Sequence, residues 1–66
     1  MKITAKFLGK EKVLVVGEGA NVLEVLRKME INPETVLVKR GKEIITEDEP
    51  LAGRDEIEII KVVSGG

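Results

Sequence analysis

Apolar and polar positions alternate over the first eight residues, which is the pattern of a half-buried β-strand. Ile3, Ala5 and Phe7 share one face, while lysine and threonine side chains occupy the other. A β-branched run over residues 12–16 predicts a second strand, and the glycine-containing sequence at 9–11 predicts a tight turn between the two strands. We therefore expect an N-terminal hairpin with Phe7 in the core.

A helical period follows the hairpin. Asn21 is a favourable N-cap, and a glutamate three residues further on resembles the capping-box pattern. The apolar positions of this period are Val22, Leu23, Leu26 and Met29. Asn32-Pro33 predicts the end of the helix, because proline disfavours the α conformation in the residue before it. The pattern predicts a helix of about three turns.

Three further strand patterns follow the helix. Residues 35–40 carry adjacent apolar and β-branched positions, so we expect this strand in the middle of the sheet. Residues 43–46 and 56–63 predict a short fourth strand and a long last strand, and Leu51 is expected to anchor the loop between them in the core. The order β-β-α-β-β-β indicates an α+β roll, in which a mixed sheet of four to five strands covers one helix.

The last predicted strand changes its phase. Ile57 and Ile59 alternate with glutamates, whereas Ile60 and Val62 occupy the face that the glutamates held before them. Strand periodicity predicts that Ile60 and Val62 face solvent, where apolar side chains would form a docking patch. Two alternatives remain open: a bulge that turns these residues into the core, and a strand buried on both faces near its end.

The sequence closes with Ser64, Gly65 and Gly66. We expect a single domain over residues 1–63 and a flexible tail over residues 64–66. Glycine suits places where the backbone passes through a tight space, so a carboxylate on this tail could enter a narrow channel of another protein. The alternative is an inert, frayed terminus.

Composition narrows the function. The 66 residues include no Cys and no His, which excludes disulfides, thiolate nucleophiles, imidazole bases and the usual zinc ligands. A formal net charge of −1 gives no electrostatic case for nucleic acid or an anionic membrane as a partner. No apolar run approaches the roughly 20 residues of a membrane helix. We expect a monomeric cytoplasmic carrier or binding module that is not an enzyme and holds no metal or cofactor.

Two charged clusters are interpreted as solvated surface. Glu47-Asp48-Glu49 lacks the ligand spacing of a calcium loop, so a solvated loop is expected. Lys39 and Arg40 are expected to keep a sheet face soluble, with an acidic partner as the alternative. Abundant Glu and Lys, with no Gln or Cys, is typical of proteins from hot environments.

Over its whole length the chain resembles the ThiS/MoaD family of ubiquitin-like sulfur carrier proteins. The resemblance rests on the β-grasp order and on four segments: Val22-Leu23-Glu24-Val25-Leu26, Asn32-Pro33-Glu34, Asp55-Glu56-Ile57 and Val62-Val63-Ser64-Gly65-Gly66. The chain's size favours the thiamine-type ThiS branch over the molybdopterin-type branch, whose members are usually longer. The turns at 40–42 and 53–55 depart from the residues usual in the family.

The resemblance implies that this protein is a substrate of other enzymes. An activating enzyme of the ubiquitin-activating type, using ATP and Mg²⁺, would adenylate the Gly66 carboxylate. Sulfur from a persulfide enzyme or sulfide would then displace AMP and leave a thiocarboxylate, which donates sulfur to thiazole synthase or another acceptor. Gly65 would keep the channel free of side chains, and Ile60, Val62 and Ser64 would contact the partner.

Four other functions fit the same terminus. The chain could be a molybdopterin-type carrier or serve tRNA thiolation. It could instead be a ubiquitin-like modifier that is joined to lysines through Gly66. From a different class, it could be a plain interaction domain with an inert end.

Overall fold

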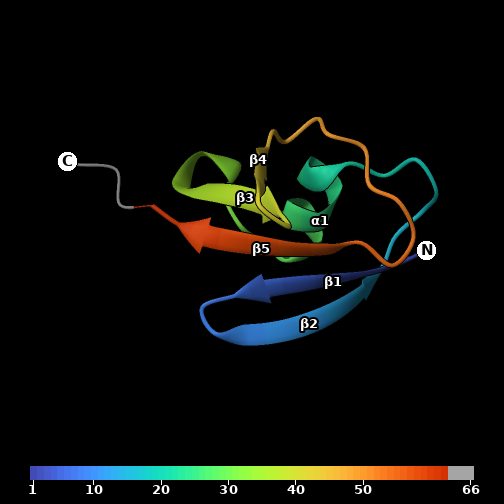
Figure 1. Ribbon diagram of the computed structural model, residues 1–66, viewed down its shortest axis with the longest axis horizontal. Coiled ribbons are helices and arrows are strands. Elements are labelled where there is room, and N and C mark those ends of the chain that lie inside the picture. Colours follow the sequence, from blue (N-terminus) through green and yellow to red (C-terminus); the bar gives the residue numbers. More distant parts are fainter. Residues whose placement is uncertain (63–66) are drawn as a thin grey trace.

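Five strands form one mixed sheet in the order β2-β1-β5-β3-β4, and one helix lies on one of its faces (Figure 1). The computed structural model describes residues 1–62. The strands are β1 (Lys2–Phe7), β2 (Lys10–Val15), β3 (Val36–Arg40), β4 (Glu43–Ile45) and β5 (Glu56–Lys61). The helix is α1 (Val22–Lys28), and a 3₁₀ turn, η1 (Pro33–Thr35), precedes β3.

The strand pairing confirms the expected α+β roll. β1 and β5, the first and last strands of the chain, pair in parallel, while the other three neighbouring pairs are antiparallel. This arrangement of a mixed sheet over a single helix is the β-grasp fold. The predicted domain end at residue 63 and the predicted tail at 64–66 lie outside the described residues.

The first hairpin is tighter than expected. Leu8 and Gly9 form its two-residue turn with φ values of 52° and 76°, so β2 begins at Lys10 rather than at residue 12. Left-handed φ angles at both central residues give the turn a twist that matches the flanking strands. Because Leu8 is not a usual residue for this conformation, the sequence pattern places the turn one residue too late and the start of β2 two residues too late.

The helix begins as expected and ends early. The Asn21 side chain accepts a hydrogen bond from the Glu24 backbone N–H at 3.1 Å, which confirms the predicted N-cap. At the other end Glu30 takes a left-handed conformation with φ 58°, and the Ile31 N–H donates to the Leu26 carbonyl at 2.9 Å. This is a Schellman-type end, a place where glycine is usual. The helix is therefore shorter than the predicted three turns, and η1 follows it.

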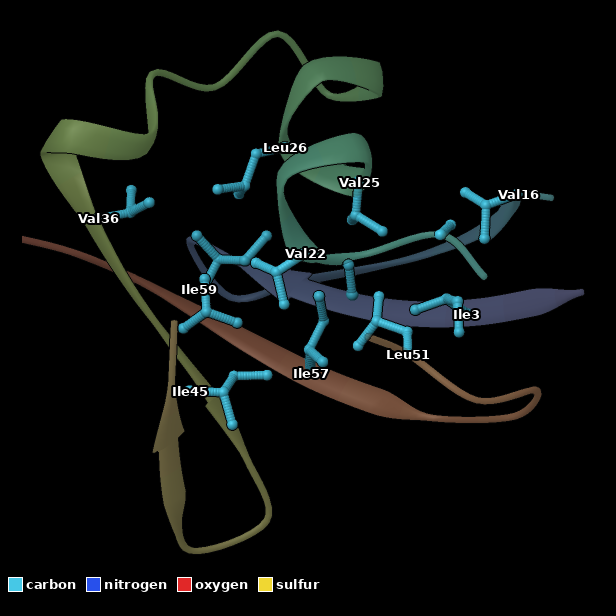
Figure 2. Close-up of a cluster of buried hydrophobic side chains, with 13 residues drawn as sticks. Ile3, Val16, Val22, Val25, Leu26, Val36, Ile45, Leu51, Ile57 and Ile59 are labelled. Atoms are coloured by element: carbon cyan, nitrogen blue, oxygen red, sulfur yellow. The ribbon is translucent and has the colours of Figure 1, made fainter. Parts of the chain in front are cut away.

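The core lies between α1 and the sheet face beneath it (Figure 2). Val22, Val25 and Leu26 of the helix pack over Ile57 and Ile59 of β5. The complete set of buried apolar side chains is Ile3, Ala5, Val16, Ala20, Val22, Val25, Leu26, Val36, Val38, Ile45, Leu51, Ile57 and Ile59. Leu51 is buried as expected, and Phe7 is half-buried and packs against the edge of this cluster.

The position of β5 corrects one expectation. β5 lies in the middle of the sheet between β1 and β3, whereas β3 is flanked by β5 and the short β4. Residues of β3 alternate between the buried and the outer face, so this strand is not buried on both sides. The central strand is therefore the one that leads into the C-terminal residues.

Candidate functional site

The predicted docking residues lie at the end of β5. Ile60 is in the strand, and Val62 follows it, with its N–H donating to the Thr35 carbonyl at 2.9 Å. Ser64, Gly65 and Gly66 lie outside the described residues. The structure thus places one of the five predicted site residues on β5 and a second directly after this strand.

Ile60 points to the outer face of the sheet, the face opposite α1. The register of β3 and β5 is continuous from Lys39–Glu58 to Val36–Lys61, which excludes a bulge that would turn Ile60 inward. Ile60 and Val62 are nevertheless half-buried rather than fully exposed. For Ile60 the reason is that Leu37 lies directly opposite it on β3 and the end of β1 lies on its other side.

Apolar side chains extend from Ile60 across the outer face. Leu37, its direct partner on β3, is 43% exposed, and Leu8 follows β1 one residue beyond the Phe7–Ile59 pair. We call Leu8, Ile60 and Leu37 the outer apolar row. Ile44 on β4, which is 64% exposed, lies on the same face beside Lys39. Exposed apolar groups gathered on one sheet face mark a surface suited to a protein partner.

A row of charged side chains borders the outer apolar row. It runs across four neighbouring strands with alternating sign: Glu11, Lys6, Glu58 and Lys39. Opposite charges on directly paired strands attract, whereas like charges would repel. The outer face therefore combines an apolar strip near the end of β5 with a neighbouring row of charges of alternating sign.

Arg40 joins the end of β3 to the loop between β4 and β5. Its Nη2 is 2.9 Å from Glu49 Oε2, and its Nη1 is 3.4 Å from Asp55 Oδ2 and 3.2 Å from the Pro50 carbonyl oxygen. These bonds, the Glu49 hydrogen bond first, raise the pKa of Arg40. Arg40 and Glu49 were both expected to be solvated surface charges; their side chains are 32% and 36% exposed, but they also pair with each other, which was not expected.

Asp48, in the same loop as Glu49, also forms a side-chain hydrogen bond. The Thr46 hydroxyl donates a hydrogen bond to Asp48 Oδ1, and this bond lowers the pKa of the Asp48 carboxyl.

Over residues 1–62, no group of three or more acidic, Cys or His side chains is arranged to hold a metal ion. The helix of the described part of the chain is too short and too polar to cross a membrane.

The sequence matches to known proteins cover all or nearly all of the chain. The sequence model of the ThiS family matches residues 2–66. The sulfur carrier protein TtuB from Thermus thermophilus is 32% identical, with both chains covered completely. An uncharacterized protein from Archaeoglobus fulgidus is 35% identical, again over the whole of both chains.

Solved structures share the fold. The thiamine biosynthesis protein ThiS from Geobacter metallireducens superposes with a TM-score of 0.70 at 24% identity, with both chains fully covered. A ubiquitin-like protein from Caldiarchaeum subterraneum superposes with a TM-score of 0.55 at 20% identity over 97% of this chain and 96% of its own. With the family match running through the β-grasp domain into the Gly65-Gly66 sequence, the chain belongs to the ThiS family of ubiquitin-like sulfur carriers.

Proposed function

We propose that this protein carries sulfur as a thiocarboxylate on Gly66 and donates it to the thiazole part of thiamine biosynthesis. The observation that carries the proposal is the ThiS family match, which runs through residue 66 and so includes the Ser64-Gly65-Gly66 sequence. The 32% identity with a sulfur carrier protein over the whole of both chains supports the sulfur-carrier part of this role.

The chemistry begins with activation of a poor acyl donor. A Gly66 carboxylate oxygen attacks the α-phosphorus of ATP, and pyrophosphate leaves to give an acyl-adenylate. Sulfide then attacks the acyl carbon, the bond to AMP breaks, and a proton is released as the thiocarboxylate forms. When a persulfide is the donor, a second thiol cleaves the resulting acyl disulfide. The activating enzyme supplies Mg²⁺ and the groups that stabilise the phosphates.

The two glycines suit this role because of their size. A side chain on either of them would crowd the acyl carbon while sulfur attacks it. No catalytic side chain is needed on the carrier itself, since its reactive group is a backbone carboxylate. The outer apolar row lies at the end of β5 that leads to these residues, and this position supports its use in docking to the activating enzyme.

Intact-mass spectrometry tests the proposal directly. Protein incubated with its activating enzyme, ATP and sulfide should gain about 16 Da, the difference between sulfur and oxygen. A chain that lacks Gly66 should gain nothing under the same conditions. Protein-sized conjugates on lysines, without the thiocarboxylate, would indicate a modifier, and no change at all would indicate an inert terminus.

A carrier for another sulfur acceptor is the second candidate. The relative named sulfur carrier protein TtuB is 32% identical, whereas ThiS from G. metallireducens, at 24%, shares the fold. Loaded carrier should therefore be offered to thiazole synthase and, separately, to a tRNA-thiolating enzyme. Transfer to thiazole synthase supports the thiamine role, and transfer only to tRNA replaces it with the second candidate.

A further inference from the structure

β2 forms one edge of the sheet and presents open hydrogen-bonding groups. The Val16 N–H donates to the Met1 carbonyl at 2.9 Å, and the Met1 amino group donates to the Val16 carbonyl at 2.6 Å. Because bonded and non-bonded pairs alternate in an antiparallel ladder, every second residue from Val16 back to Lys10 bonds to β1. The N–H and C=O groups of the residues between them face the open edge. These residues are Glu11, Val13 and Val15.

The side chains of β2 divide into two chemically different faces. Val13 and Val15 lie on the outer face and are 62% and 64% exposed. Lys12 pairs with the buried Ala5, so Lys12 and Lys10 lie on the face that carries α1, and both are exposed. An adjacent strand would therefore meet Val13 and Val15, with Glu11 at one end, on the outer face, and two positive charges beside the half-buried Leu14 on the other.

We propose that the open edge of β2 binds an extended segment of a partner protein in which aliphatic and acidic side chains alternate. The segment pairs with the three N–H and three C=O groups of the edge and becomes a sixth strand. Its aliphatic side chains lie beside Val13 and Val15 on the outer face, within cross-strand contact distance. Its acidic side chains lie on the other face, beside Lys10 and Lys12.

Charge argues against a second copy of this chain as the occupant. In a continuous sheet made by two β2 edges, Lys10 and Lys12 of both copies would lie on the same face. Like charges on neighbouring strands repel, and lysine on an edge strand is a common protection against self-pairing. The same two lysines attract a segment with acidic side chains. Charge complementarity thus selects the partner.

The site is independent of the proposed sulfur chemistry. β1 separates β2 from β5, so the open edge does not border the strand that leads to the C-terminal residues. A segment bound to β2 leaves the end of β5 and Leu37 uncovered. The carrier could then be held by one protein while another acts on its terminus.

Titration of the isotope-labelled full chain with a synthetic peptide tests the site. The probe is an acetylated and amidated octapeptide of alternating valine and glutamate, and the same peptide with lysine in place of glutamate is its control. We expect amide shifts and slower hydrogen exchange at Glu11, Val13 and Val15, and at least about tenfold weaker binding of the lysine peptide. Absence of binding, or changes centred on β4, would overturn the proposal.

Val13→Pro separates strand addition from simple apolar contact. Proline removes only the N–H that faces the open edge, because Val13 makes no ladder bond to β1. We expect at least about tenfold weaker peptide binding, whereas Val13→Thr, which keeps the N–H, should bind closer to the original protein. Ile44→Thr on the opposite edge is the matched control for Val13→Thr, since the two side chains are similarly exposed, at 64% for Ile44 and 62% for Val13. Unchanged binding by Val13→Pro contradicts the proposal.

A second variant guards against a folding defect. If circular dichroism shows that Val13→Pro is unfolded, the double substitution Lys10→Glu with Lys12→Glu carries the test, and it should weaken binding of the acidic peptide at least about tenfold. Sedimentation of the protein alone provides the remaining outcome. A dimer that these charge reversals alter would assign the edge to a second copy and overturn the proposal.

Discussion

Thr46 and Asp48 show at the scale of single residues how one hydroxyl changes the acidity of its neighbour. The Thr46 hydrogen bond stabilises the charged carboxylate, so the pKa of Asp48 is lower in the folded chain than in the unfolded one. A lowered folded pKa contributes stability above the unfolded pKa, and this contribution is lost as the pH falls through the folded pKa.

We predict that Thr46→Val raises the pKa of the Asp48 carboxyl toward its ordinary value. Some of the lowering should remain, because a backbone hydrogen bond at Asp48 also favours the charged form. Carbon-detected NMR titration of the carboxyl group measures the change. Thr46→Ser, which keeps the hydroxyl, should leave the pKa low. An equal pKa in the valine variant and the original protein would show that the hydroxyl has no such effect.

Truncation of Leu26 should lower the free energy of unfolding more than truncation of Leu23 on the same helix. Leu26 is 1% exposed in the core, whereas Leu23 is half-buried. Leu26→Ala should lower the free energy of unfolding by about 2–5 kcal/mol, because it removes apolar contacts and leaves a cavity. Leu23→Ala should cost less. The chain has no Trp or Tyr, so circular dichroism in urea is the suitable measurement. Equal losses would contradict the packing described here.

At the scale of elements, periodicity predicted the strands and the start of the helix. It failed where backbone conformation, rather than burial, decides the boundary. Leu8 and Glu30 take left-handed conformations without being glycine, so no residue type marked the start of the first turn or the end of α1. Sheet order was also beyond a local pattern: a run of apolar residues suggested that β3 is central, but pairing places β5 there.

The candidate site was predicted in part. The phase change in β5 correctly placed Ile60 on the outer face, because the side-chain period of a strand is fixed. Leu37 and Leu8 were missed, since their position beside Ile60 depends on pairing between distant segments. The Arg40 bonds were missed for a similar reason, although a lone basic cluster near acidic loop residues was a usable signal.

The outer apolar row yields a prediction at the same scale. Leu37→Asp should weaken binding to the activating enzyme at least about tenfold, because it places a charge in the apolar strip. Titration calorimetry with the purified enzyme measures this effect. Ile60→Asp should act in the same direction but cost more stability, since Ile60 is half-buried.

Val15→Asp is the matched control for the docking surface. Val15 lies on the same outer face but pairs with Lys2, at the far end of the sheet from Leu37. It is exposed, so the substitution should leave both folding and binding to the activating enzyme nearly unchanged. Equal loss of binding in both variants would mean that the enzyme covers the whole face or does not use the outer apolar row.

At the scale of the whole molecule, the buried core is separate from the terminus that is proposed to react. Every buried core side chain described lies between Ile3 and Ile59, and the central strand β5 continues beyond this core toward the C-terminal residues. The surfaces proposed for partners are distributed around the same core: the outer apolar row near the end of β5, and the open edge of β2. A small domain can therefore present a reactive end while its packing stays intact.

Deletion of Gly66 tests this separation. We predict that the shortened chain keeps its Tm within about 2 °C, because the residues that form the described core are all retained. The same chain should lose formation of the acyl-adenylate and the thiocarboxylate completely, since its new terminal carboxylate stands one residue short. Thermal unfolding by circular dichroism and ATP–pyrophosphate exchange with the activating enzyme measure the two effects. Deletion of Met1, whose backbone bonds to Val16, is the contrasting control and should lower the Tm. A marked loss of Tm without Gly66 would place that residue in the folded core, and undiminished exchange would show that its carboxylate is not the group activated.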